Sequence, residues 1–174
     1  MDRAAVVDEM ERARTDFHRL LDTATSTELR AGTDGTKWSN EQLLFHMLFG
    51  YLIVRTLLGL VRLLARAPDG VSRRFAAALD AATGPFHVIN YLGSRGGARI
   101  LGHAGMERLL DRVITHLQAN LVRETDEALA SGMHFPLGWD PYFQDVMTVG
   151  DVYHYGTQHY DHHRKQLTLA AATA

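Results

Sequence analysis

The sequence predicts an all-α protein with four or more helices, and three observations lead to this prediction. Apolar residues recur at three- and four-residue steps in several long segments, which is the period of an amphipathic helix. Clusters of Thr, Ser, Gly and Pro separate these segments, and no stretch of useful length alternates apolar and polar residues as a strand does. The length of 174 residues suits one domain, which we expect to span residues 1–174.

The first helix is expected from Asp2 to about Thr23. Its apolar positions follow helical steps and form one face: Val6, Met10, Ala13, Phe17, Leu20 and Leu21. The segment that follows, rich in Thr, Gly and Asp, predicts a loop.

The second helix is expected to start at Ser39, because Gln42 lies three residues later and the two side chains can form a capping box. It is expected to run to about Arg66, where Pro68-Asp69-Gly70 ends it. The 13 residues from Gln42 to Val54 carry no Asp, Glu, Lys or Arg. A membrane span needs roughly 18 such residues, so this pattern indicates a buried core helix.

Residues 71–105 are expected to form an additional short helical or loop insertion. Val71 to about Ala82 has a helical pattern, whereas the glycines between Gly93 and Gly105 predict a flexible stretch. These glycines match neither GxGxxG nor GxxxxGK[ST], so they do not predict a phosphate loop.

A strong helical pattern returns from Met106 to Leu129, and Ser131-Gly132 ends it. A connector rich in aromatic residues and Pro then leads to a last helix. Thr148 and Asp151 have capping-box spacing at the start of that helix.

Composition excludes several classes of function. The 18 Lys and Arg residues against 20 Asp and Glu give a net charge of −2, which argues against a dedicated nucleic-acid binder. The chain has no Cys, so thiolate metal sites and a Cys nucleophile are excluded. The first ten residues lack the features of a signal peptide, and a cytoplasmic location is expected.

The histidines give the sharpest chemical signal. His159 and His163 stand at i and i+4, so both side chains project from one helix face and can share a metal ion. A third ligand is available from His46, which lies in an apolar run where an imidazole costs free energy unless it is hydrogen-bonded or coordinated. Three imidazoles suit Zn, Ni, Cu or Fe(II) and leave coordination positions for water or substrate.

Spacing alone leaves alternatives open. An i, i+4 pair of histidines also arises on ordinary exposed helix faces, and a single His in an apolar run is often a satisfied core residue. His162 forms an i, i+3 pair with His159 that offers a second choice of ligands.

Two segments resemble the DinB-like superfamily. The phrase GTKWSNEQLLFHML, residues 35–48, is similar to the family's second-helix signature, in which a Trp and a capped helix start precede the first metal-binding His. The ending HYDHHRKQL, residues 159–167, is similar to the pattern H-x-x-x-H-R-x-Q-[LI] of the final helix. The motifs cover about 23 residues, and the helical layout extends the resemblance over nearly all of the chain.

This resemblance implies a four-helix bundle with a metal site of His46, His159 and His163, which favours His163 over His162. It implies a divalent ion, most often Zn or Ni. Better-understood members are thiol-dependent enzymes, such as bacillithiol or mycothiol S-transferases and a mycothiol-dependent maleylpyruvate isomerase. We therefore expect S-transfer from a low-molecular-weight thiol to an electrophilic small molecule, with a hydrolase, an isomerase or a non-catalytic metal- or ligand-binding bundle as alternatives.

Other residues are weaker candidates for the site. Tyr155 lies one turn before His159 on the same face and is the candidate acid or base. Asn90, Tyr91, Trp139 and Asp140 are expected in loops that line the pocket, and Gln166 is a candidate to orient a ligand. The expected partner is a small-molecule substrate, with no nucleic acid and no membrane, and the apolar helix faces are compatible with a homodimer.

Overall fold

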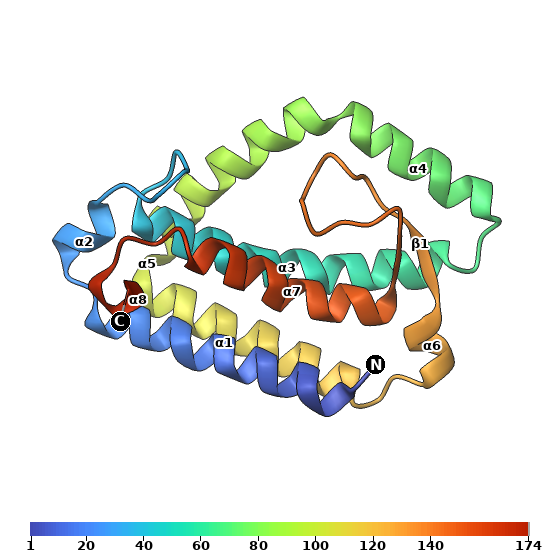
Figure 1. The fold of residues 1–174 in the computed structure, drawn as a ribbon, viewed down its shortest axis with the longest axis horizontal. Coiled ribbons are helices and arrows are strands. Elements are labelled where there is room, and N and C mark those ends of the chain that lie inside the picture. The colour runs from blue at the N-terminus through green and yellow to red at the C-terminus, as the bar shows by residue number, and fades with distance from the viewer. Residues whose placement is uncertain (174) are drawn as a thin grey trace.

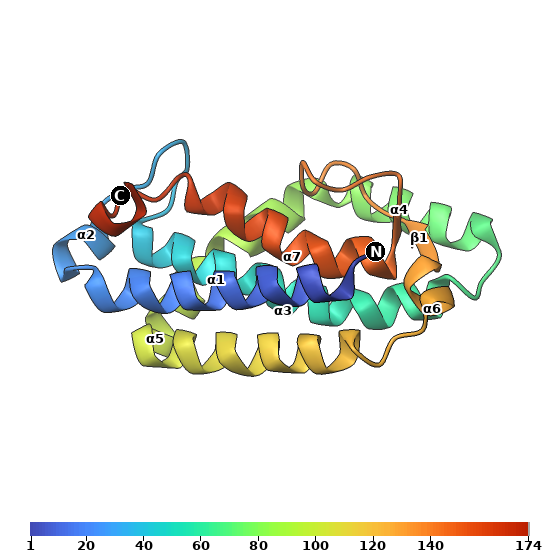
Figure 2. The ribbon, with the colours of Figure 1, turned by 60° about the horizontal axis from the view of Figure 1, so that its bottom comes forward.

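Four long helices lie side by side in the computed structural model, which describes residues 1–173 (Figures 1 and 2). They are α1 (Arg3–Thr23), α3 (Asn40–Leu64), the second part of α5 (Thr83–Leu121) and α7 (Val149–Arg164). Helix α3 packs against both α5 and α7, and α1 closes the bundle against the same two helices. The expected all-α bundle is thus confirmed.

Helix α1 begins where the Asp2 side chain accepts hydrogen bonds from the amides of Ala4 and Ala5. The six apolar residues that the sequence placed on its inner face are all buried. After α1 comes a short helix, α2 (Ser26–Arg30), which begins with a capping box between Thr25 and Glu28.

Helix α3 is the central element of the core. The capping box of Ser39 and Gln42 starts it, as the sequence predicted, and its residues from Leu43 to Leu48 are all buried. By length and composition alone, α3 is apolar enough to cross a membrane, but 56% of its most apolar window is buried inside the protein. Its apolar surface is therefore largely covered by the other helices of the bundle.

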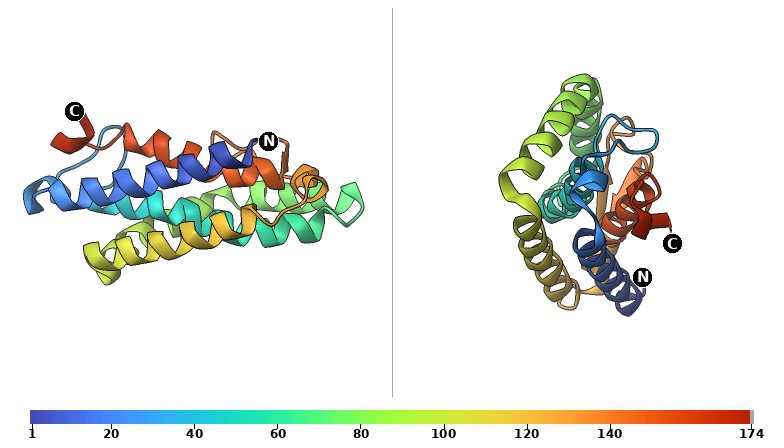
Figure 3. Two further views of the ribbon diagram at one scale, coloured as in Figure 1. Left: turned by 90° about the horizontal axis from the view of Figure 1, so that it is seen from below. Right: turned by 90° about the vertical axis from the view of Figure 1, so that its left-hand side faces the viewer.

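Helix α4 (Asp69–Ala81) and the first part of α5 form an arch beside the bundle (Figures 1 and 3). The prediction of a flexible stretch between Gly93 and Gly105 is wrong, because the chain there is helical up to a kink at Gly102. Gly102 has a φ of +60° and a ψ of −179°, so α5 turns there from the arch into the bundle. This helical segment packs closely on α3 at Gly97, where a Cβ would overlap the ring of Phe45.

The helix expected from Met106 to Leu129 is shorter than predicted. Helix α5 ends at Leu121, a turn follows, and α6 (Asp126–Ala130) starts anew with Thr125 as its N-cap. Because α6 resets the helical phase, Leu129 is buried, whereas its neighbour Ala128 is only partly buried.

A two-stranded antiparallel sheet holds the ends of the aromatic connector together. Strand β1 (Gly132–His134) pairs with β2 (Val146–Thr148), and Met133 lies opposite Met147. Helix α7 follows β2 directly, with the expected capping box of Thr148 and Asp151. The last helix is α8 (Ala170–Thr173). The loop between the strands lies under the arch in Figure 1.

Candidate metal centre

Three histidines meet between α3 and α7. His46 comes from α3, and His159 and His163 come from successive turns of α7. One ring nitrogen from each lies within 4.8 Å of the others. The centroids of the His46 and His163 rings are 4.6 Å apart, as are those of His159 and His163. The ligand set implied by the family resemblance is therefore brought together in space.

Two glycines allow α3 and α7 to approach closely at this point. A Cβ on Gly50 would lie 2.9 Å from Cε1 of His159, so only glycine leaves room for that ring. One turn earlier on α7, a Cβ on Gly156 would lie 2.9 Å from the Tyr51 ring. The spacing of the two helices, and with it the position of His159, depends on these glycines.

The environment keeps all three imidazoles neutral. Burial lowers the pKa of His46 to about 3 and that of His163 to about 4, and nearby histidines add to both effects. The pKa of His159 is also well below its ordinary value, first because of burial and then because of His46 and His163. Neutral imidazole is the form that binds a metal ion.

Hydrogen bonds on the outer side of two rings fix their tautomers. The Ser94 hydroxyl donates to the backbone carbonyl of Asn90 at 2.9 Å, and its oxygen lies 3.3 Å from Nδ1 of His46. Because the single Ser94 proton is used, Ser94 accepts from His46 Nδ1–H. Oε1 of Gln166 likewise accepts from His163 Nδ1–H at 2.7 Å. Both assignments leave Nε2 with a free lone pair.

His159 completes the fit to a metal ion. Its Nδ1 is buried and has no hydrogen-bond partner in the described part of the chain, and Nε2 has only a 4.0 Å contact with Asp140. A buried imidazole without hydrogen bonds costs free energy, which coordination would offset. Three neutral nitrogen donors suit a divalent ion such as Zn or Ni.

The structure separates His163 from His162. The His162 ring faces Tyr142, whose hydroxyl lies 3.4 Å from Nδ1 of His162, and His162 is outside the three-histidine cluster. Of the two pairs that the spacing left open, His159 and His163 are therefore the pair that clusters with His46, as the resemblance implied.

Two neighbours of the cluster were not identified as site residues from the sequence. The Trp38 ring stacks on His46 at 4.4 Å and covers the cluster from one side. Trp38 belongs to the quoted second-helix motif, and this motif was the only feature of the sequence that pointed to Trp38. Ser94 lies in a segment with no recognisable pattern, so no signal pointed to it.

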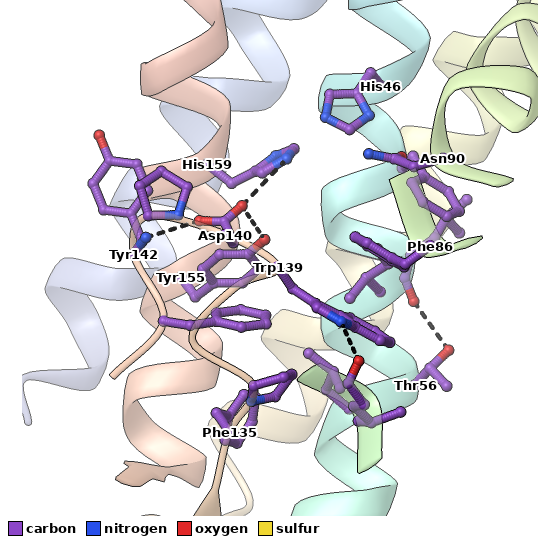
Figure 4. Close-up of a pocket in the computed structure, with 18 of the residues that line it drawn as sticks. His46, Thr56, Phe86, Asn90, Phe135, Trp139, Asp140, Tyr142, Tyr155 and His159 are labelled. Carbon is purple, nitrogen blue, oxygen red and sulfur yellow. Dashed lines mark hydrogen bonds and ion pairs between the residues drawn. The ribbon is translucent and has the colours of Figure 1, made fainter. Parts of the chain in front are cut away.

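A cavity of about 490 Å³ opens from the cluster (Figure 4). Asn90, Trp139, Asp140 and Tyr155 line it, whereas Tyr91 does not. Asn90 and Tyr91 were expected in a loop, and this is wrong, because both lie in α5. The side chain of Tyr91 stacks beside Trp38 at 6.3 Å instead.

Asp140, which is partly buried, and the buried Tyr155 form a polar pair beside the cluster. The Tyr155 hydroxyl donates to Oδ2 of Asp140 at 2.9 Å, and the backbone amide of Tyr142 donates to Oδ1 at 2.9 Å. Burial raises the pKa of both side chains, and the pKa of Tyr155 lies well above its ordinary value. Tyr155 is thus a protonated donor that holds Asp140 in place, and its expected part in catalysis stays a prediction.

Comparison with known proteins identifies one relationship. The sequence model of the DinB superfamily matches residues 9–167, a span that contains all three histidines. No curated protein and no solved structure matches the chain.

Proposed function

Because the chain belongs to the DinB superfamily, we propose that it is a metal-dependent enzyme in which His46, His159 and His163 hold one divalent ion. We further propose that it joins a low-molecular-weight thiol to an electrophilic small molecule. The observation that carries this proposal is the cluster of three neutral imidazoles at the end of a cavity. Three protein ligands leave room for exogenous ligands, as in catalytic rather than structural sites.

In the proposed reaction, the metal ion and the side chains of the protein have separate roles. A bound divalent ion supplies Lewis-acid activation, which lowers the pKa of a water or thiol ligand so that a nucleophile exists near neutral pH. The chain has no Cys, so the thiol must come from a co-substrate. Asp140, fixed by Tyr155 next to His159, offers a hydrogen-bond acceptor that can orient the head group of a bound molecule.

Elemental analysis of the purified protein tests the metal site. We expect about one Zn or Ni ion per chain, the stoichiometry of a single three-ligand site. The ion should be lost in His46→Ala and His163→Ala and kept in His162→Ala, a neighbouring histidine outside the cluster. Circular dichroism checks that each variant is folded. No uptake of Zn, Ni, Mn or Fe(II), or equal uptake by all variants, would refute the site.

A reaction screen with the metal-loaded protein tests the activity. We expect loss of an electrophile that requires an added thiol and is abolished by His163→Ala. Loss that proceeds without thiol would instead indicate a hydrolase or isomerase. Binding of the small molecule without any product would indicate a non-catalytic bundle.

A further inference from the structure

The three clustered histidines and Asn90 lie at one end of the cavity, and Thr56 is a polar residue at the other end. Figure 4 shows His46, His159 and Asn90 together at the histidine end, with Trp139, Phe86 and Phe135 farther along. Oδ1 of Asn90 is buried and makes no hydrogen bond of ordinary length in the described chain, although the Asn90 side chain lies close enough to His46 to raise the pKa of that ring. A buried amide oxygen without a partner is suited to receive a donor from a bound molecule.

The far part of the cavity has a rigid aromatic wall. The rings of Phe86 and Trp139 stack at 3.9 Å with an interplanar angle of 9°. Trp139 is held there because its Nε1 donates to the carbonyl of Leu79 at 2.8 Å, while the amide of Gly138 donates to Asp80 at 3.0 Å. These bonds anchor the wall to α4, so its apolar surface is present before any ligand binds.

No Lys or Arg is among the residues that line the cavity in the described chain, and Asp140 is the one acidic residue there. The carboxylate or phosphate of a small molecule is usually recognised by Arg or Lys, and an ionised group buried without such a partner loses much binding free energy. The apolar and aromatic side chains along α3 and the connector favour an uncharged ring system instead.

We propose that the cavity selects an uncharged, largely apolar molecule with an aromatic ring. The ring lies against Phe86 and Trp139, and a single polar head group points at the histidines and Asn90. This inference rests on the proposed function, because it names the electrophile of that reaction. An anionic group at the aromatic end would have no Lys or Arg partner among the residues that line the cavity. At the other end, the proposed divalent ion would itself supply positive charge.

A pair of fluorescent probes tests this inference without relying on the metal. N-phenyl-1-naphthylamine is uncharged, and 8-anilinonaphthalene-1-sulfonate has the same ring system with an added sulfonate. We expect the uncharged probe to bind at least about tenfold more tightly, which corresponds to about 1.4 kcal/mol. Equal or tighter binding of the sulfonate would overturn the inference.

A cation added to the cavity should reverse the preference. Thr56 lines the cavity and is exposed, so Thr56→Lys adds a charge without removing core volume. We expect it to tighten sulfonate binding several-fold and weaken binding of the uncharged probe. Val88→Lys is the matched control, because Val88 is 57% exposed on α5 and does not line the cavity. The same response in both variants would place the probes elsewhere and overturn the inference.

The two proposals fail in different ways. If the histidines bind no metal, elemental analysis shows it, while the probes still report the selectivity of the cavity. If the metal binds and the sulfonate probe is preferred, only the substrate class is wrong.

Discussion

At the scale of the residue, a glycine that binds nothing itself positions a metal ligand. Gly50 lies against the His159 ring, where any side chain would displace the imidazole. The lowered pKa values show that the three rings are already deprotonated at neutral pH. The geometry of the rings, rather than their protonation, therefore limits metal binding near pH 7.

Replacing this glycine should damage the site more than the fold. We expect Gly50→Ala to weaken metal binding at least about tenfold and to destabilise the protein by about 1–3 kcal/mol through overpacking. Gly59→Ala on the same helix is the control, because a Cβ there has open space and should leave metal binding unchanged. Chelator competition measures affinity. Equal affinity in the two variants would show that Gly50 does not set the position of His159.

The hydrogen bond from His163 to Gln166 gives a second prediction at this scale. Gln166→Leu removes the acceptor that fixes the His163 tautomer, and we expect metal affinity to fall about 10–100-fold. Gln166→Glu keeps an oxygen acceptor and should bind the metal far better than the Leu variant. Titration of each variant with Zn in the presence of a competing chelator checks this. Wild-type affinity in Gln166→Leu would contradict the proposed role.

At the scale of the element, α5 serves two purposes because of one kink. Its first part carries Asn90 and Ser94 on the arch, and its second part is a helix of the bundle. Gly102 joins them in a backbone conformation that is essentially restricted to glycine. The direction of the arch, and so the wall of the cavity, depends on this residue.

The kink can be tested by substitution. We expect Gly102→Ala to lower the free energy of unfolding by about 1–3 kcal/mol, the usual cost of such a conformation for a residue with a Cβ. Gly93→Ala is the matched control on the same helix, because its conformation is helical and its Cβ has open space. Urea denaturation compares the two. A loss no greater than that of the control would mean that α5 does not need a glycine at the kink.

At the scale of the whole molecule, a buried histidine joins the arch to the connector. His134 on β1 contacts Asp145 through Nδ1 at 2.8 Å and Asp69, at the start of α4, through Nε2 at 3.0 Å. Both ring nitrogens face carboxylates, so both donate when the ring is protonated. The pKa of His134 is raised, mainly by the hydrogen bond to Asp145 and then by that to Asp69, although burial and the nearby Arg73 oppose this.

This linkage predicts a pH-dependent stability. A raised folded-state pKa means that the stabilisation is fully present below about pH 6.5, the unfolded value, and is lost as pH rises through the folded pKa. We expect His134→Gln to be less stable than wild type at about pH 6, with a smaller difference at about pH 9. His116→Gln is the control, because the exposed His116 ring bonds Asn120 instead of a carboxylate. A difference independent of pH would exclude the charged bridge.

The sequence by itself determined the features that depend on local spacing. The buried face of α1, the capping boxes at Ser39 and Thr148 and the His159/His163 pair all follow from residues within a few turns of one another. His46 was a candidate ligand because it lies in an apolar run, and the quoted motifs then supported that choice. These features could be predicted because helical geometry fixes which side chains share a face.

Tertiary packing decided the rest. The glycines before Gly102 are helical although their weak helix propensity favours a loop, and one of them, Gly97, packs directly on Phe45 of α3. Ser94 reaches His46 from a segment 48 residues farther along the chain, and residues of α3, α5, α7 and the connector come together to line the cavity. Contacts between distant segments leave no periodic trace in the sequence, so only the folded structure reveals them.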